Sequence, residues 1–247
     1  ALNKSPNNSL AFSYIARAEN GLRNPKEGYK YANIAIKFDP LNSNAYFARA
    51  NAQRKLGNYS SAINDYNIVI EKDPNFISGY IGRGLTKDLL EDYEGAIEDF
   101  NMALELNPKD IFALNNRAVT KESLMNYEGA FEDYKKSIEL NPKFPGSYAN
   151  RALLKLNLKN YEGAFEDLNI AIELEPKDAI FYIKRGYSKQ ILKNHEGAIE
   201  DYNTAVKLGY KDEFLFSQRG IAKQKLENHE DAIEDYNTAI EINPEFS

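Results

Sequence analysis

Proline recurs at a fixed interval along most of this sequence. The prolines of the series are Pro40, Pro74, Pro108, Pro142, Pro176 and Pro244. Successive members are 34 residues apart, except that the last interval spans two periods and Tyr210 stands where a proline is missing. A period of this length is typical of repeat proteins, in which each repeat is one supersecondary unit. The chain is therefore expected to be an array of similar units.

The repeat boundaries follow when this proline is placed at position 32 of the unit. A divergent first unit then occupies about residues 11–42, after a polar amino-terminal tail of residues 1–10. The six full units are residues 43–76, 77–110, 111–144, 145–178, 179–212 and 213–246. The sequence thus predicts a single array of seven repeats over residues 11–247.

Each unit carries the pattern of two amphipathic helices. Position 16 is always Asn or Asp in the full units, as at Asn58 and Asp92, and these residues favour helix starts. The proline at position 32 ends the second helix because it cannot continue the hydrogen-bond ladder. Small residues at positions 8 and 20 let two crossing helices approach closely. One such pair cannot bury its apolar face alone, so neighbouring pairs must stack.

The repeating unit resembles the tetratricopeptide repeat. The resemblance rests on the period of 34, Gly or Ala at position 8, Ala at position 20, an aromatic residue at position 24 of most units and Pro at position 32. It covers the chain from about residue 11 onward. It implies an all-α fold of seven stacked helix-turn-helix units that wind into a right-handed superhelical solenoid. In that family the first helices line a concave groove that binds peptides.

Charged residues at two positions depart from the family pattern. Position 7, commonly Leu, is Arg in every full unit, and position 11, commonly Tyr, is Lys in five of them and Gln53 in the other. Position 7 lies on the buried face of the first helix, where an unpaired arginine would be costly. Position 23 supplies an aspartate in each full unit, whereas the first unit has Tyr31 there. We expect a structural ladder of Arg–Asp pairs, within or between repeats, that fixes the register of stacking. Its members are Arg49, Arg83, Arg117, Arg151, Arg185 and Arg219 with Asp65, Asp99, Asp133, Asp167, Asp201 and Asp235.

The positions that vary between units define the predicted binding surface. Positions 2, 5, 6, 9, 12 and 13 lie on the opposite face of the first helix and carry many apolar residues. An extended apolar surface usually marks an interaction site, and interspersed amides suit a peptide backbone. The predicted partner-binding residues are Phe47, Asn51, Ile81, Leu85, Phe112, Asn116, Val119, Asn150, Leu153, Leu156, Ile183, Lys184, Tyr187 and Ile191. Leu153, Ile183 and Tyr187 are expected at the middle of this surface. Asn116 and Asn150 share position 6 in consecutive units and resemble the short asparagine ladders of some family members.

The predicted function is that of a non-catalytic adaptor that binds a peptide or helix of another protein in this groove. One alternative is a self-associating module, in which the carboxy-terminal apolar residues meet a second copy. Another is a regulatory region of a larger enzyme or secretion component. The family's clamp for chaperone tails needs Lys at position 5 and Asn at position 9 of one unit. No unit has that pair, so chaperone-tail binding is not expected.

Composition and motifs argue against chemistry. The 247 residues include no cysteine, which excludes disulfides, cysteine-ligated zinc and thiol catalysis. A net charge of −6 disfavours nucleic acid and acidic membranes as partners. No apolar run approaches the roughly 18 residues that span a bilayer, so no membrane insertion is expected. The sequence does not fix the compartment, and the working expectation is a soluble protein, with the cytoplasm slightly favoured. His195 and His229 replace the Tyr of position 17 and are interpreted as packing residues. No catalytic residue, cofactor or metal site is therefore predicted.

Overall fold

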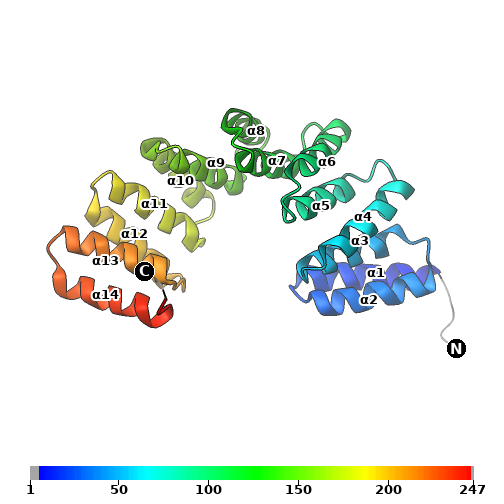
Figure 1. Cartoon of the computed structure of the whole chain (residues 1–247), viewed down its shortest axis with the longest axis horizontal. Coiled ribbons are helices and arrows are strands. Elements are labelled where there is room, and N and C mark those ends of the chain that lie inside the picture. Colours follow the sequence, from blue (N-terminus) through cyan, green and yellow to red (C-terminus); the bar gives the residue numbers. More distant parts are fainter. Residues whose placement is uncertain (1–5, 246–247) are drawn as a thin grey trace. The chain divides into compact units, whose positions relative to one another are not determined.

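The computed structural model describes residues 6–245, and over this range it consists of fourteen α-helices joined by short turns, with no strand. The helices follow one another as seven hairpins, two helices to a repeat (Figure 1). The hairpins are α1 (Pro6–Gly21) with α2 (Pro25–Phe38), α3 (Ser43–Lys55) with α4 (Tyr59–Lys72), α5 (Ile77–Asp88) with α6 (Tyr93–Leu106), α7 (Ile111–Ser123) with α8 (Tyr127–Leu140), α9 (Pro145–Asn157) with α10 (Tyr161–Leu174), α11 (Ala179–Ile191) with α12 (His195–Lys207), and α13 (Glu213–Lys225) with α14 (His229–Ile242). The expected all-α fold of helix-turn-helix units is confirmed.

The contacts divide the chain into two compact units, with the boundary between Asp133 and Tyr134 in α8. In the first unit, helices α1 to α7 pack against their neighbours in chain order, and α9 to α14 do the same in the second. The core of each is built from alanine or glycine at position 8 and alanine at position 20, around large buried side chains such as Tyr66 and Tyr202. Small residues at the crossings are what allow this close approach.

The turns explain where the helices begin and end. At the start of the second helix of four repeats, the side chain of the position-16 residue accepts a hydrogen bond from the glycine three residues later, as Asp92 does from Gly95 (3.1 Å). The residue before a proline is restricted to extended backbone, and Asn107, which precedes Pro108, has a φ of −141° and ψ of 93°. Helix α6 therefore ends at Leu106, the residue before Asn107 and Pro108.

The first helix starts earlier than the sequence indicates. It begins at Pro6, whereas the first repeat is placed at about residue 11. Proline is well suited to a first helical turn because its fixed φ is helical and its missing N–H would have no partner there. Ser9 is buried and its Oγ donates to the Ala35 carbonyl of α2 (2.8 Å), which attaches this turn to the hairpin. Residues 1–5 of the expected tail lie outside the described residues.

Each ladder arginine pairs with the aspartate sixteen residues later in the same repeat. In all six pairs Nε and Nη2 donate to the two carboxylate oxygens at distances between 2.5 and 2.9 Å. This two-pronged geometry is the strongest that an Arg–carboxylate pair adopts. Because pairing is within the repeat, the first repeat, which has Tyr31 at position 23 and no ladder arginine, leaves no ladder member without its partner.

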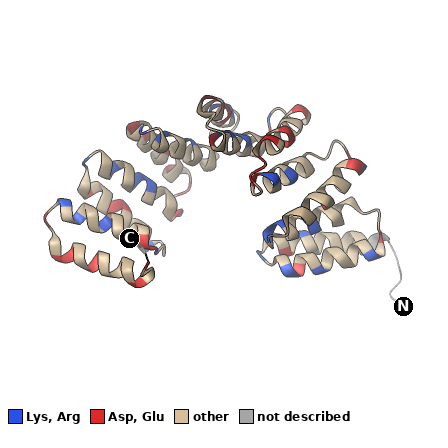
Figure 2. Ribbon diagram, viewed as in Figure 1, with Lys and Arg blue, Asp and Glu red and all other residues tan. Residues whose placement is uncertain are grey.

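Further side chains surround each Arg–Asp pair. The lysine of position 11 is a second cation for the aspartate, as Lys189 is for Asp201 (2.9 Å). An aromatic ring at position 4 lies beside five of the arginines, with centroid distances from 5.2 to 5.9 Å. In five repeats Nη1 also donates to an asparagine of the preceding repeat, which joins one repeat to the next. These asparagines are Asn33, Asn67, Asn101, Asn169 and Asn203. Positive and negative residues are interspersed along both units (Figure 2).

Candidate functional site

The predicted partner-binding residues fall into both units. Seven are in the first unit and seven in the second, and each group is described within its own unit. Asn116 belongs to the first unit and Asn150 to the second, so the asparagine ladder stays a prediction. The Asn116 amide donates to the Phe112 carbonyl of its own helix (2.8 Å). That bond uses one of the two N–H donors of the Asn116 side-chain amide, so one remains for a bound peptide backbone.

Exposure separates the predicted residues into two kinds. Phe112, Val119 and Ile191 present 57%, 41% and 42% of their surface to solvent, as a binding surface requires. Ile183 is only 6% exposed because it packs in the core with Tyr202. Asn115 and Ala149, also at position 5, are 6% and 7% exposed. Phe47, Ile81 and Ser217 at the same position are half-buried, and Phe47 packs against Tyr66. Position 5 is therefore largely shielded from solvent, and its place in the binding surface stays a prediction.

An apolar cleft in the second unit brings five of the predicted residues together. It has a volume of about 300 Å³ and lies along the first helices of the last three repeats, α9, α11 and α13. Its lining is mostly aliphatic and aromatic. The lining residues are Leu153, Leu156, Ile180, Ile183, Lys184, Tyr187, Tyr210, Asp212 and Phe214. The rings of Tyr187 and Phe214 lie 6.3 Å apart at an angle of 45°. Ile183 contributes to this wall although most of its side chain is buried.

Tyr210 and Asp212 come from the turn between α12 and α13. This is the turn in which the repeat's proline is missing. Gly209, which follows the last turn of α12, has a φ of 89°. The Tyr210 N–H donates to the Ala205 carbonyl (3.1 Å), and the Gly209 N–H donates to the Val206 carbonyl (3.0 Å). These are the paired bonds of a helix end closed by a left-handed glycine. The turn thereby places Tyr210 at the cleft, where the Tyr210 hydroxyl donates to Asp212 Oδ2 (2.8 Å).

Lys184 is the single basic residue of the cleft. The ion pairs formed by residues 6–245 include none to Lys184, although its neighbours in the sequence, Arg185 and Lys189, both pair with Asp201. Burial lowers the pKa of Lys184 to about 8, and the charge of Asp178 acts weakly in the opposite direction. The other carboxylate of the cleft, Asp212, is already bonded to Tyr210 and caps α13 through the Leu215 N–H (2.8 Å). The amine of Lys184 is thus available to an acidic group.

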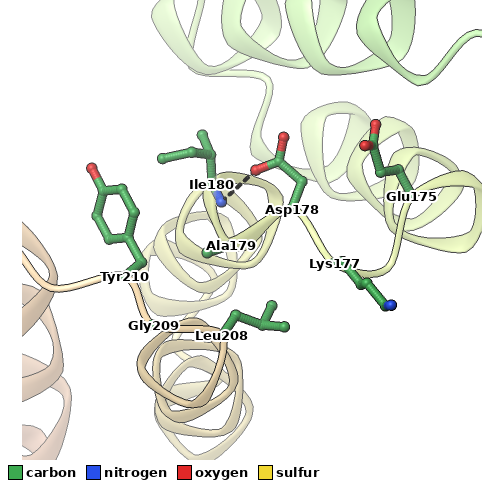
Figure 3. A pocket seen from close by; sticks show the side chains of 8 residues that line it. All are labelled: Glu175, Lys177, Asp178, Ala179, Ile180, Leu208, Gly209 and Tyr210. Atoms are coloured by element: carbon green, nitrogen blue, oxygen red, sulfur yellow. Dashed lines mark hydrogen bonds between the residues drawn. The ribbon is translucent and has the colours of Figure 1, made fainter. Parts of the chain in front are cut away.

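A second hollow of about 410 Å³ adjoins the cleft and shares Ile180 and Tyr210 with it. Figure 3 shows these two residues at one side of the hollow and Glu175 and Lys177 at the other. Asp178 does not point freely into it, because its carboxylate accepts from the Ile180 N–H (2.9 Å) as the cap of α11. The hollow extends the apolar cleft toward the turns at the ends of α10 and α12.

Residues 6–245 contain no cluster of three His, Asp or Glu side chains placed to hold a metal ion. His195 and His229 are the first residues of α12 and α14. None of the helices within the described range is both long and apolar enough to cross a membrane.

Sequence reasoning missed two groups of residues. Tyr210 and Asp212 were not expected at the site, although the departure of "KLGYKD" from "ELNPKD" is the visible signal that this turn differs. The asparagines that join the repeats through the ladder arginines were also missed. Their signal is recurrence at position 25, in phase with the ladder.

The fold and the repeating pattern define a protein built from stacked helical hairpins. A family model of the tetratricopeptide repeat matches residues 43–76, 77–110, 111–144 and 214–246, which is more than half of the chain. Two further models of the same repeat match residues 133–166 and 179–208. The chain therefore belongs to the tetratricopeptide repeat family. These repeats are in general scaffolds for protein–protein interaction, and the fold is typically non-catalytic.

Solved structures show the same fold. A tetratricopeptide repeat protein from Parabacteroides merdae ATCC 43184 is similar with a TM-score of 0.70 and 22% identity, over 96% of this chain and 94% of that one. A chain of the APC/C hetero-tetramer Cut9–Hcn1 gives a TM-score of 0.78 at 17% identity, over 96% of this chain and 46% of that one. Pseudomonas aeruginosa pilF gives 0.74 at 16% identity, over 83% and 93%. At these identities the likeness concerns the fold alone. None of the curated proteins matches this chain in sequence.

Proposed function

We propose that this chain is a non-catalytic scaffold that binds a segment of a partner protein in the apolar cleft of its second unit. The observation that carries the proposal is the cleft itself: apolar side chains from three successive repeats surround one lysine that has no ion pair. Apolar surface of this kind is rarely left in water without a binding role. Leu153 and Tyr187, two of its lining residues, are at a position that varies between repeats and are not part of the ladder that holds the hairpins together.

The lining specifies the chemistry of the segment. A volume of about 300 Å³ suits one large aliphatic or aromatic side chain. Lys184 suits an acidic side chain next to it, since a half-buried amine gains most from an opposite charge in the same apolar surroundings. The adjoining hollow, which shares Ile180 and Tyr210, leaves room for the chain to continue. The proposed partner segment therefore carries an apolar anchor beside an aspartate or glutamate.

Selection from a displayed library of random peptides tests this proposal. The full chain serves as bait, and bound peptides are eluted and sequenced. Peptides enriched by the wild type should share a large apolar residue with an acid one to three positions away. A Leu153→Glu, Tyr187→Glu variant should lose them, because a carboxylate at either position would be desolvated by the incoming anchor.

The matched control is Ile170→Glu, which adds the same charge to an apolar residue of α10 that is 37% exposed and lies outside the cleft. It should keep the peptides, and circular dichroism should show unchanged helicity for all variants. A consensus without an acid, or equal retention by the double variant, is incompatible with the proposed site.

Self-association is a second candidate, and a feature of α14 favours it. Ile233 and Ile240 of this helix are 58% and 55% exposed. The equivalent residues one repeat earlier, Ile199 and Val206, are partly buried and pack with the core that includes Leu215 and Phe216 of α13. A second copy could cover the last helix in the same way. Light scattering across a concentration series tests it: a molar mass that rises for the wild type and stays monomeric for Ile233→Glu, Ile240→Glu would establish association through this face.

A further inference from the structure

A separate pocket lies in the first unit, between α1 and α3, and has the opposite character to the apolar cleft. It is a cavity of about 260 Å³. Three of its lining residues are basic and none is acidic, in a chain whose net charge is −6. The lining residues are Arg17, Asn20, Gly21, Phe47, Asn51, Arg54 and Lys55. Positive charge is thus concentrated around one hollow of an acidic protein.

The three basic residues have no acidic partner. The ion pairs of the described chain include none to Arg17, Arg54 or Lys55. The contrast with Arg49 is direct, because Arg49 is also on α3 and forms a two-pronged pair with Asp65. Like charges gathered around a pocket raise each other's energy, and an anion placed between them lowers it. The pocket is therefore electrostatically prepared for a negatively charged group.

The unused hydrogen-bonding groups of the pocket are mainly donors. Arg54 Nε is buried and makes no hydrogen bond within the described part of the chain. Lys55 Nζ donates to the Asn20 carbonyl and keeps two further N–H groups. The side-chain oxygen of Asn51 is already used, since Asn51 Oδ1 accepts a hydrogen bond from the Tyr66 hydroxyl (3.0 Å). Asn20 Oδ1 also lacks a partner, but it lies against Gly28 of α2. A ligand that brings several acceptor oxygens would satisfy Arg54 and Lys55 together.

We infer that this pocket binds a dianionic phosphate group, held by Arg17, Arg54 and Lys55. A phosphate monoester carries a charge of about −1.5 to −2 near pH 7 and three strong acceptor oxygens. Guanidinium groups bind phosphate with two parallel hydrogen bonds. A carboxylate, or the diester of a nucleic acid, brings one charge against three cations. The ring of Phe47, 5.9 Å from the Arg17 guanidinium carbon, offers an apolar wall for the ester carbon.

The same chemistry has two sources: free phosphate, or a phosphorylated side chain on a partner protein. Titration of the full chain, followed by NMR of the backbone amides, separates them. The probes are inorganic phosphate, a short phosphoserine peptide and its unphosphorylated form, with acetate and dimethyl phosphate as singly charged controls at equal ionic strength. Inorganic phosphate or the phosphopeptide should shift the signals of residues 17–21 and 51–55 and reach saturation. Tighter binding of the phosphopeptide identifies a phosphorylated partner, and equal binding identifies free phosphate.

Two variants locate the site. Arg54→Gln should weaken binding at least tenfold, and Arg17→Gln, at an exposed residue where folding is not at risk, should do the same. Lys109→Gln removes an exposed charge of the same unit away from the pocket and should bind like the wild type. The inference is overturned if no doubly charged probe binds, if acetate or dimethyl phosphate binds equally well, or if both arginine variants bind as the wild type does. Because the pocket and the apolar cleft are in different units, failure here leaves the proposed function untouched.

Discussion

The pocket of the first unit and the cleft of the second are built from the same repeat positions with opposite side chains. Positions 9 and 12 carry Arg17 and Arg54 in the first unit, whereas they carry Leu153 and Leu156 in the second. The hairpins do not change with them, because positions 7, 8, 20, 23 and 32 hold the helices together in both units. The comparison teaches that the framework and the recognition surface use separate residues. A surface can therefore change from basic to apolar without altering the fold.

The largest expected effect concerns the framework, which differs at one repeat of the first unit. Asp201 of the second unit faces two cations, Arg185 and Lys189, as Asp99 and Asp133 of the first unit also do. Asp65 of the first unit faces Arg49 alone, because position 11 of its repeat is Gln53. Asp201→Ala leaves both cations without their acid and is expected to lower the free energy of unfolding by about 3–5 kcal/mol. Asp65→Ala should lower the free energy of unfolding by roughly 1–2 kcal/mol less than Asp201→Ala does, because it leaves only one cation without its acid.

Urea unfolding followed by circular dichroism at pH 7 measures both losses. Glu200→Ala is the control, since it removes an exposed acid next to Asp201 in the sequence and should stay within about 0.5 kcal/mol of the wild type. Equal losses for Asp201→Ala and Asp65→Ala would show that the lysine of position 11 adds nothing to the pair.

The second prediction concerns the charge that remains in the apolar cleft. Burial lowers the pKa of Lys184 from its ordinary 10.5 to about 8, so the folded state disfavours the charged amine. Lys184→Met is expected to raise the free energy of unfolding by about 1–2 kcal/mol at pH 7, the part of the shift that survives relaxation of the site. The gain should be complete below pH 8. It should shrink between pH 8 and 10.5, where the folded wild type loses its proton before the unfolded chain does.

Paired unfolding curves at pH 7 and pH 9 test this. The exposed Lys136→Met is the control and should show neither the gain nor its pH dependence. A gain that is the same at both pH values would mean that the amine of Lys184 is hydrated in the folded protein.

The third prediction separates stability from binding. Gly57 in the first unit and Gly209 in the second both have a positive φ, 80° and 89°, and no atom would lie within 4 Å of an added Cβ. Alanine at either position should cost about 1 kcal/mol of stability, because only the backbone conformation resists it. Gly209→Ala alone should weaken a peptide bound in the cleft, since this turn places Tyr210 there. Thermal melts and fluorescence anisotropy with a selected peptide give the two readouts. Equal peptide affinity for both variants would show that the position of Tyr210 does not contribute to peptide binding.

The framework was predictable because it recurs. The interval between prolines, the small residues and the pairing of Arg with Asp are each repeated in phase, so six copies supported one interpretation. The start of α1 was less accessible, because the divergent first repeat has no ladder pair and Ser9 fixes its first turn through a contact with Ala35, far away in the sequence.

The candidate sites were only partly predictable, because they depend on where the repeat departs from itself. Five cleft residues could be named from their positions, but Tyr210 reaches the cleft only through the backbone turn at Gly209. The burial of Ile183 depends on how closely α11 packs on its neighbours, which no pattern within one helix specifies. Arg17 and Arg54 meet across two helices of adjacent repeats, one of them the most divergent in the chain.

Salt should give the smallest effect and the sharpest contrast between the two sites. Binding of a dianionic phosphate to three cations is expected to weaken about tenfold or more when NaCl rises from roughly 50 to 500 mM, because ions screen each contact. The peptide in the cleft should weaken only about two- to threefold, since Lys184 is its one charged contact and apolar burial is insensitive to screening. In the Lys184→Met variant even this small dependence should vanish. A steep salt dependence that persists in this variant would place another charged group in the peptide contact and make the two sites more alike than their linings indicate.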